Sequence, residues 1–450
     1  RNYREGLKRP AYMPTKGFTD QPFFGPSMPR HAAYQVLDAV IGQKRPLDEV
    51  LENQDRLNAL SVRDRAFARS LVMVVLRRRG QIDALISHCL ERKIPRKARG
   101  LQNILRLGIA QVLFLNTAIH AAVNESVDMT AELGFTAHKK MVNAVLRRLT
   151  REGQKLISTQ DEARLNTPPW LWDSWTTAYG EDLCRQIAEA HASEPPLDIT
   201  VAQDPEIWAK QLEAKALPTG SLRRATGGRG TELPGFEEGT WWVQDAAAAL
   251  PVTLLGDVKG KTVIDLCAAP GGKSAQLAAL GANVVAVDRS ENRNKRLRAN
   301  LARLNLDVET VTADAESWQP KELADAVLLD APCSSTGTLR RHPDVGWLKS
   351  TEDVTKLTNL QSRLSAAAIN MVKPGGLLVY CTCSLQPEEG VEIYVELNQS
   401  GLLTPQPITP EERPELEPFL TREGTLRTLP YYWPEIGGMD GFFAARWKRL

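Results

Sequence analysis

The sequence predicts a multidomain protein with an all-α N-terminal domain, a small α/β linking module and a C-terminal α/β domain. Three observations lead to this fold class. The chain has 450 residues, which is enough for two or three domains. Residues 30–150 carry apolar side chains at helical spacing. From residue 262 onward, apolar β-branched runs alternate with helical stretches, which is typical of a parallel sheet with helices on both faces.

The composition is that of a globular protein rather than a disordered tail or a fibre, with 42% hydrophobic and 24% charged residues. Six cysteines in 450 residues exclude a small disulfide scaffold and indicate a reducing compartment. The uncharged stretch between Arg106 and Glu125 is interrupted by polar side chains, and the first thirty residues lack the apolar core of a signal peptide. We therefore expect a cytoplasmic protein that does not bind membranes.

The N-terminal part divides into two segments. Residues 1–29 are rich in proline and glycine and contain five Lys and Arg, so we expect a flexible basic extension. Residues 30–150 are expected to form the helical domain. Over 61–151 there are 17 Lys and Arg against 6 Asp and Glu, a local net charge of +11. This basic block suggests a polyanionic partner such as a nucleic acid, although solvated helix faces would have the same composition.

The rest of the chain also divides into two segments. Residues 151–245 are broken into short elements by proline pairs, which suggests a small linking module. In residues 246–450 we expect strands at 262–267, 283–288, 308–314, 325–330 and 376–383, and helices at 273–280, 290–304 and 352–372. In such a sheet, ligands bind beyond the carboxyl ends of the strands.

The first candidate site is the segment D-L-C-A-A-P-G-G-K, residues 265–273, which follows one strand and begins a helix. Its small residues let a ligand approach the backbone, and the helix N-terminus favours negative charge. A phosphate-binding P-loop is excluded because Cys267 stands where that motif needs glycine. A purely structural strand–helix turn remains the alternative.

Two acidic residues end further strands. Asp288 ends the strand V-V-A-V-D, where a carboxylate can accept hydrogen bonds from ribose hydroxyls. Asp314 ends the run 308–314, where it could meet an adenine amino group. Each alone is more typical of a helix N-cap than of a ligand contact, but three strand ends that meet at one crevice favour the ligand.

Three cysteines are placed at the same edge of the sheet by the segments D-A-P-C-S-S-T-G, residues 330–337, and Y-C-T-C-S, residues 380–384. Cys381 lies within the apolar run, so we expect it to pack in the core, whereas Cys383 is better placed for exposure. A zinc site built from these cysteines and His342 is disfavoured because no C-x-x-C pair is present. We expect no metal.

These parts suggest a reaction on cytosine. A thiolate that adds to carbon 6 makes carbon 5 able to attack an electrophilic methyl group, which is covalent catalysis. A cationic neighbour such as Lys273 would favour the thiolate, and a carboxyl group such as Asp330 could hydrogen-bond ring nitrogen 3. The target base must be unstacked to reach the pocket.

Together, residues 265–273, residues 330–337 followed by R-R-H-P-D, and T-C-S with P-E-E resemble the RNA cytosine-5 methyltransferases of the Nol1/Nop2/Sun group. The resemblance covers residues 239–450, including Gln244-Asp245 and D-G-F-F at 440–443. It implies a Rossmann-like methyltransferase domain that uses S-adenosylmethionine.

The helical domain adds a second resemblance. H-A-A-V-N-E-S-V from His120 and V-N-A-V-L-R from Val142 are similar to the NusB-type RNA-binding domain. A NusB-like domain followed by this catalytic domain is the bacterial RsmB (Fmu/Sun) arrangement. That family methylates a cytosine in small-subunit (16S) ribosomal RNA, so the resemblance implies ribosomal RNA as partner, and we expect a monomer.

The resemblance also implies roles for single residues. Cys383 would be the nucleophile, and Cys333 would assist product release. Arg340 and Arg341 would lie near RNA. The cofactor contacts would be Cys267, Ala268, Ala269, Pro270, Gly271, Gly272, Lys273, Asp288, Asp314 and Asp330.

Three departures from the family pattern are visible. Gly390 stands where the family usually has Asn after P-E-E, Ala313 precedes Asp314 in place of Gly, and residues 197–200 lack the L-R-x-N pattern. Three other functions stay open: a DNA cytosine methyltransferase with Cys333 as nucleophile, the same reaction on another RNA such as tRNA, and a non-catalytic RNA-binding assembly factor.

Overall fold

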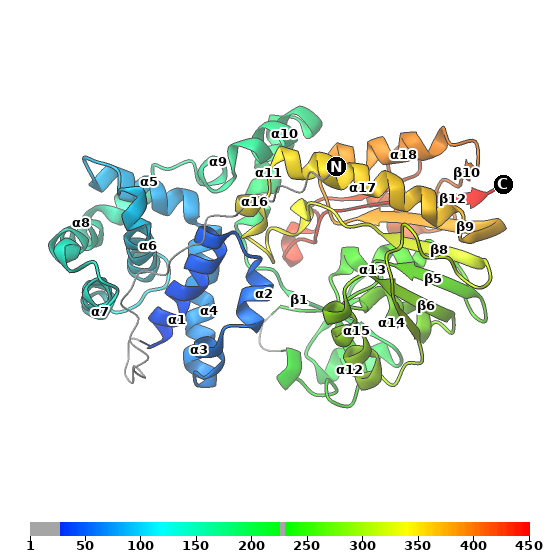
Figure 1. Cartoon of the computed structure of the whole chain (residues 1–450), viewed down its shortest axis with the longest axis horizontal. Helices are drawn as coiled ribbons and strands as arrows, with labels where there is room; N and C mark the ends of the chain where they lie inside the picture. The colour runs from blue at the N-terminus through cyan, green and yellow to red at the C-terminus, as the bar shows by residue number, and fades with distance from the viewer. Residues whose placement is uncertain (1–27, 226–229) are drawn as a thin grey trace, which may run out of the picture. The chain divides into compact units, whose positions relative to one another are not determined.

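The computed structural model describes residues 28–225 and 230–450, and the chain divides into two compact units, Arg1–Asp161 and Glu162–Leu450 (Figure 1). The expected extension 1–29 lies outside the described residues except for its last two. Met28 and Pro29 belong to the first helix, so the helical region begins earlier than expected.

The described part of the first unit consists of helices joined by turns, as predicted. Leu101, Ile104 and Leu105 are buried on one helix, in agreement with their helical spacing. On the same helix, a Cβ at Gly108 would lie 2.8 Å from Leu146, so two helices approach closely there. The helices are α1 (Met28–Leu37), α2 (Leu47–Glu52), α3 (Asp55–Asn58), α4 (Val62–Arg77), α5 (Arg79–Cys89), α6 (Arg99–Leu113), α7 (Ile119–Glu132) and α8 (Lys139–Ile157).

The second unit begins with a helical segment and a small antiparallel sheet of order β2-β3-β1-β4. These elements share a compact unit with the large sheet that follows and do not form a unit of their own. One reason is that Trp175 and Tyr179 hydrogen-bond to Gln386 and Leu385 beyond the last parallel strand. The elements are α9 (Glu162–Asn166), α10 (Pro169–Tyr179), α11 (Glu181–His191), β1 (Leu197–Val201), α12 (Pro205–Gln211), β2 (Lys215–Ala216), β3 (Leu222–Arg224) and β4 (Trp241–Val243).

The large sheet has the order β10-β12-β9-β8-β5-β6-β7, with β11 paired to β12. The five strands from β9 to β7 are parallel, as the sequence predicts. The antiparallel strands β10, β11 and β12 were not predicted. The strands are β5 (Thr262–Leu266), β6 (Asn283–Asp288), β7 (Glu309–Thr312), β8 (Ala324–Asp330), β9 (Val372–Thr382), β10 (Leu403–Pro405), β11 (Leu426–Thr428) and β12 (Phe442–Arg449).

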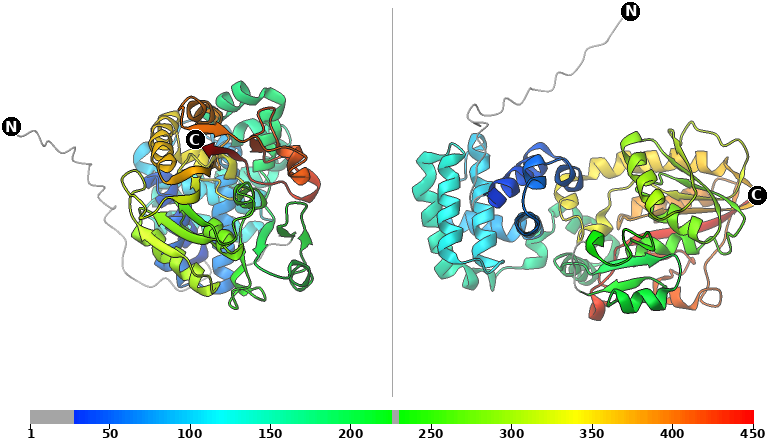
Figure 2. Two further views of the ribbon diagram at one scale, coloured as in Figure 1. Left: turned by 90° about the vertical axis from the view of Figure 1, so that its right-hand side faces the viewer. Right: turned by 90° about the horizontal axis from the view of Figure 1, so that it is seen from below.

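Helices cover both faces of this sheet (Figures 1 and 2). On one face, α17 and α18 bury residues such as Leu364 and Ile393 against the strands. On the other, α13 and α14 bury Leu250 and Leu277. The helices are α13 (Ala246–Thr253), α14 (Gly272–Ala279), α15 (Glu291–Arg303), α16 (Val345–Leu348), α17 (Thr351–Ile369) and α18 (Val391–Asn398). None of the described helices is both long and apolar enough to cross a membrane.

Candidate active site

The turn between β5 and α14 has a shape that depends on glycine. Cys267 directly follows β5 and has a φ of 62°, and Gly271 has a φ of 104°. A Cβ at Gly271 would lie 2.3 Å from Leu297 of α15, so only glycine lets the two helices pack this closely. The backbone N–H of Ala269 donates to Asp288 at the end of β6, 3.2 Å away. The turn and the β6 carboxylate are therefore held together.

The acidic residues at the strand ends differ in their surroundings. Asp288 is buried, accepts from the N–H groups of Ala269 and Ser290, and pairs with Arg293. It is not the N-cap of α15, because Ser290 holds that position. Asp314 is exposed and accepts from the N–H of Glu316 within its own turn. The carboxylate of Asp314 is thus free to meet a ligand with its second oxygen.

A pocket lies between these strand ends. Cys267, Asp288 and Asp314 line it together with the apolar Pro332, and Leu360 and Leu364 of α17 close the wall. Carboxylates beside an apolar wall suit a ligand that has a flat ring and hydroxyl donors, such as a nucleoside. The predicted cofactor residues Cys267, Asp288 and Asp314 therefore lie in one pocket.

Cys333 and Cys383 come together from the loops that follow β8 and β9. Their sulfur atoms are 3.5 Å apart, and both side chains are half-buried. The contact with Cys383 and burial raise the pKa of the Cys333 thiol well above its usual value. Cys381 is fully buried in the core, as predicted. Among the described residues no group of three or more His, Cys, Asp or Glu could hold a metal ion.

Lys273, which we expected to favour the thiolate of the attacking cysteine, is paired with a carboxylate in the structure. Its Nζ atom lies 2.7 Å from Asp330 and over the ring of Phe442. Burial alone would lower the pKa of Lys273, but the charge of Asp330 outweighs burial and raises this pKa, so the ammonium stays charged. The pair of Lys273 and Asp330 lies at the end of β8, next to the loop that carries Cys333.

Glu389 is a residue of the site to which the sequence analysis gave no role. Its carboxylate accepts from the backbone N–H and hydroxyl of Ser334, at 2.9 and 2.5 Å, and from the hydroxyl of Ser384 at 2.5 Å. Gln361 of α17 donates a fourth hydrogen bond. Because Ser334 follows Cys333 and Ser384 follows Cys383, the buried Glu389 fastens the two cysteine loops to each other. Its position within P-E-E was the available signal.

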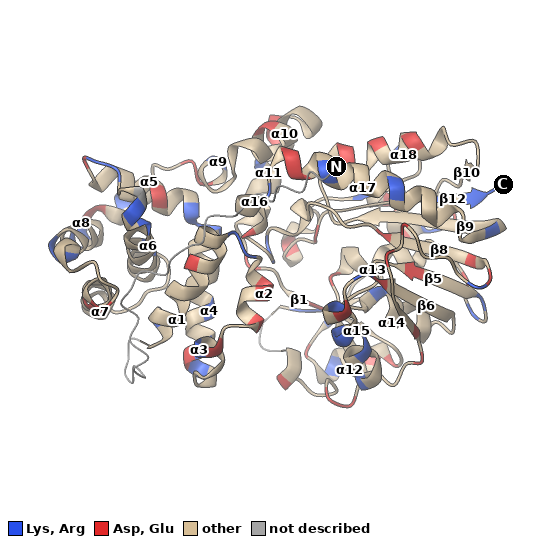
Figure 3. Ribbon diagram, viewed as in Figure 1, with Lys and Arg blue, Asp and Glu red and all other residues tan. Residues whose placement is uncertain are grey.

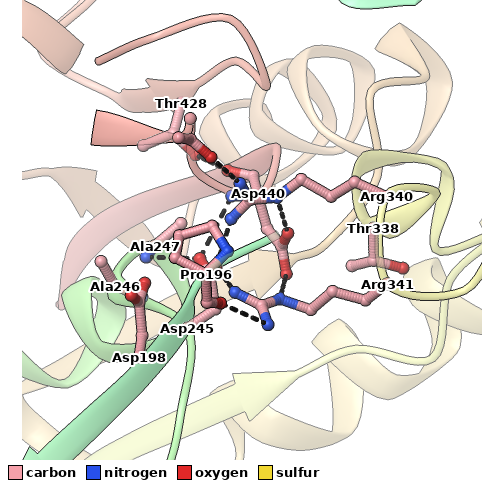
Figure 4. Close-up of polar contacts among 12 residues, drawn as sticks. Pro196, Asp198, Asp245, Ala246, Ala247, Thr338, Arg340, Arg341, Thr428 and Asp440 are labelled. Atoms are coloured by element: carbon pink, nitrogen blue, oxygen red, sulfur yellow. Dashed lines mark hydrogen bonds and ion pairs between the residues drawn. The ribbon is translucent and has the colours of Figure 1, made fainter. Parts of the chain in front are cut away.

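Arg340 and Arg341, which the resemblance places near RNA, form an ion-pair cluster with two buried carboxylates (Figure 4). Both guanidinium groups contact Asp245 Oδ2, at 2.7 and 2.6 Å, and both contact the carboxylate of Asp440. The side chain of Arg340 is 2% exposed and that of Arg341 is 20% exposed. Arg340 cannot reach a phosphate group without breaking these pairs. Burial alone would raise the pKa of Asp245, but the two arginines outweigh burial and hold this pKa below its usual range.

The cluster is connected to the cysteines through the backbone. Gly441, next to Asp440, donates its N–H to the carbonyl of Gly337 at 2.8 Å, and Gly337 donates to the carbonyl of Cys383 at 3.0 Å. A Cβ at Gly337 would lie 2.1 Å from the Gly441 carbonyl oxygen, so this contact requires glycine. The cluster therefore helps to set the position of Cys383. Asp245 and Asp440 stand in the segments that carry the resemblance, but nothing in the sequence indicated that they meet.

Comparisons with known proteins follow the same division of the chain. The family profile described as 16S rRNA methyltransferase RsmB/F matches residues 252–448, and the NusB family profile matches residues 27–151. The ribosomal RNA small subunit methyltransferase B of Cronobacter sakazakii is 34% identical over 381 residues, which cover 81% of this chain and 88% of that protein. Its counterpart in Vibrio cholerae is 35% identical over 376 residues, 80% of this chain and 85% of the relative.

Solved structures support the fold. The crystal structure of PH0851 matches with a TM-score of 0.73 at 23% identity, covering 95% of this chain and all of the other. NSun6 from Pyrococcus horikoshii, crystallised with SFG, matches 63% of this chain and 98% of its own with a TM-score of 0.54 at 18% identity.

Proposed function

Since the chain belongs to the RsmB/F family of 16S rRNA methyltransferases, we propose that it methylates carbon 5 of a specific cytosine in small-subunit ribosomal RNA through a covalent cysteine–cytosine intermediate. The observation that carries this proposal is the pair of cysteine sulfurs 3.5 Å apart, from the ends of adjacent strands. The methyl donor pocket opens at the neighbouring strand ends of the same sheet.

Cys383 is the nucleophile in this proposal. Its thiolate bonds to carbon 6 of the cytosine, and the electron pair of the double bond between carbons 5 and 6 moves toward carbon 5 and ring nitrogen 3. As negative charge develops on ring nitrogen 3, this nitrogen takes up a proton from water, and the carboxylate of Asp330, held by Lys273, accepts a hydrogen bond from the resulting N–H. Carbon 5 is then nucleophilic enough to take a methyl group.

Cys333 acts in release. After methylation, the hydrogen on carbon 5 leaves as a proton to a base, and its electron pair restores the double bond between carbons 5 and 6. The bond from carbon 6 to sulfur breaks, and Cys383 leaves as a thiolate. Cys333, in contact with that sulfur, is placed to assist this step.

The residues of the cofactor pocket fit S-adenosylmethionine, which supplies an electrophilic methyl group when bound. Asp288 and Asp314 would accept hydrogen bonds from the ribose and the adenine, and Leu360 offers an apolar wall. The remaining contacts come from the turn Cys267, Ala268, Ala269, Pro270, Gly271, Gly272 and Lys273, and from Asp330.

The helical domain, residues 30–150, supplies RNA binding. Its basic block continues along α8, where Lys and Arg follow one another (Figure 3). Basic residues that neutralise phosphates release counterions, so salt should weaken RNA affinity steeply. Residues 151–245 link this domain to the catalytic domain, residues 246–450. We propose that the protein acts as a monomer in the cytoplasm.

The experiment uses purified protein, unmodified small-subunit ribosomal RNA and tritiated S-adenosylmethionine, followed by nucleoside analysis. Wild-type protein should place the label in 5-methylcytosine. Cys383→Ala should lose both methylation and the covalent RNA adduct, whereas Cys333→Ala should accumulate the adduct, because release is impaired. Cys89→Ala, a free cysteine of the first unit, is the matched control and should behave as wild type. Full activity in Cys383→Ala would refute the proposal.

A further inference from the structure

Ser335 carries a hydroxyl group that lies beside both active-site sulfurs. Its Oγ atom is 3.5 Å from the Sγ of Cys383 and 4.0 Å from the Sγ of Cys333. The neighbouring hydroxyl groups have other partners, because Ser334 and Ser384 both donate to the carboxylate of Glu389. Lys273 is paired with Asp330. Ser335 is therefore the side chain best placed to donate a hydrogen bond to either sulfur.

The backbone of Ser335 adopts a conformation that does not favour serine. Its φ of 58° and ψ of 26° are left-handed, a region that glycine enters freely and other residues rarely. Such residues are often found where a functional site fixes their geometry. The carbonyl of Ser335 is held by the N–H and the hydroxyl of Thr338, at 3.1 and 2.8 Å.

The hydroxyl of Ser335 does not cap the helical turn that follows it, although Ser335 occupies the capping position. Ser335 is the N-cap of the short 3₁₀ turn Thr336–Thr338, where a serine side chain normally accepts from a backbone N–H. It makes no such cap hydrogen bond. The hydroxyl instead contacts the sulfurs, which points to a role in their chemistry.

We infer that Ser335 is a further catalytic residue, whose hydroxyl hydrogen-bonds to the thiolate of Cys383 before attack and to Cys333 afterward. This inference rests on the proposed function. In the thiol state Cys383 donates to Ser335 Oγ. When the thiol has lost its proton to water, the hydroxyl rotates and donates to the sulfur anion, because a hydroxyl can act as donor or acceptor.

The second half of the inference concerns Cys333. Once Cys383 is bonded to carbon 6, its sulfur is a neutral thioether and a weak acceptor. The Ser335 hydroxyl is then free to donate to Cys333. Burial and the neighbouring sulfur disfavour the thiolate of Cys333, whereas the backbone N–H of Ser335 favours it. The hydroxyl of the same residue would add a second donor if this cysteine ionises during release.

The test compares two substitutions that both remove the hydroxyl but differ in the backbone strain that they leave. Ser335→Gly removes the hydroxyl and suits the left-handed conformation, whereas Ser335→Ala removes the hydroxyl and keeps an unfavourable side chain. Asn305→Gly is the control, because Asn305 also has a left-handed φ of 52° and is exposed outside the site. All four proteins are treated with iodoacetamide between pH 6 and 10, and the alkylation of each cysteine is followed by peptide mass spectrometry.

In both Ser335 variants, Cys383 should be alkylated more slowly than in wild type at the same pH, and the RNA adduct should form about tenfold more slowly, as expected for losing a hydrogen bond to a charged group. Asn305→Gly should match wild type, and the fully buried Cys381 serves as the internal reference. Wild-type alkylation and adduct rates in Ser335→Gly would overturn the inference, even if Ser335→Ala were impaired, because strain alone would then explain Ala.

Failure of this inference can be distinguished from failure of the proposed function. If wild-type protein forms no 5-methylcytosine, the proposed function fails whatever the variants do, and the inference fails with it. If wild type and Ser335→Gly methylate RNA equally fast while Cys383→Ala is inactive, only the role of Ser335 is refuted.

Discussion

The two halves of the strand-end edge are built in different ways. In the cofactor half, at β5, β6 and β7, Ser274 bonds to Asp265 nine residues away, and Ala269 bonds to Asp288 nineteen residues away. In the cysteine half, at β8 and β9, the contacts are long-range, such as those of Arg340 with Asp440 and Asp245, 100 and 95 residues away. A local motif can therefore form the cofactor half, whereas the cysteine half depends on distant segments. A substitution in one half should therefore impair the function of that half and leave the other half intact.

The largest effect should come from the cysteine half. Asp440→Ala removes one of the two carboxylates that both Arg340 and Arg341 contact, so the buried cluster loses one compensating negative charge. We expect a loss of about 3–5 kcal/mol in the free energy of unfolding. Displacement of the backbone that holds Cys383 should slow methylation by about 100-fold. The affinity for S-adenosylmethionine should stay close to wild type, measured by calorimetry.

Glu412→Ala is the matched control for this substitution. Glu412 also pairs with an arginine of the catalytic domain, Arg446, through two contacts of 2.7 and 2.8 Å, but its side chain is 43% exposed. An exposed pair of this kind should contribute less than about 1 kcal/mol. Equal losses of cofactor affinity and of methylation in Asp440→Ala would contradict the separation of the two halves.

A smaller effect should appear in the pH dependence of stability. Asp265, unlike Asp245, has no arginine partner: one oxygen accepts from Ser274, and within the described part of the chain its Oδ1 has no hydrogen-bond partner. Burial raises the pKa of Asp265 to about 7. The folded protein thus keeps this proton while the unfolded chain loses it near pH 4.

The stability that protonated Asp265 contributes is full below about pH 4 and is lost as the pH rises to about 7. Asp265→Asn removes this titration. Between pH 5 and pH 7, wild type should lose about 2 kcal/mol more than the variant in the free energy of unfolding by urea. Exposed Asp307→Asn should keep the wild-type profile. Parallel profiles for wild type and Asp265→Asn would show that Asp265 is ionised in the folded protein.

The contrast between the halves also explains what the sequence could and could not predict. The five parallel strands could be predicted, and so could the meeting of Cys267, Asp288 and Asp314 at one pocket, because hydrophobic runs and strand-end acids are local patterns. Pairing of β12 with β9 could not be predicted, because register between segments about 60 residues apart leaves no local pattern.

The ion pairs and carboxylate contacts of the cysteine half could not be predicted either, because they also join distant segments. The motif R-R at 340–341 has the appearance of an RNA contact, since arginines often bind phosphate groups. Its partners Asp245 and Asp440 are separated from each other by 195 residues and meet only in the folded chain. The role of Glu389 was hidden likewise, because its hydroxyl partner Ser334 lies 55 residues away.

The smallest effect should come from the cofactor half. Asp314→Asn keeps a side-chain oxygen that can accept from the N–H of Glu316, but it removes the charge at the pocket. Loss of one charge-assisted hydrogen bond should weaken S-adenosylmethionine binding by about tenfold. The covalent RNA adduct, measured without cofactor, should form at the wild-type rate, because the cysteine loops are unchanged. Asp307→Asn, another exposed acid of the same domain, should leave both quantities unaltered. If the adduct formed more slowly in Asp314→Asn, the two halves would be coupled. Asp314→Asn would then impair the cysteine half, as Asp440→Ala is expected to do, and the two substitutions would not have separate effects.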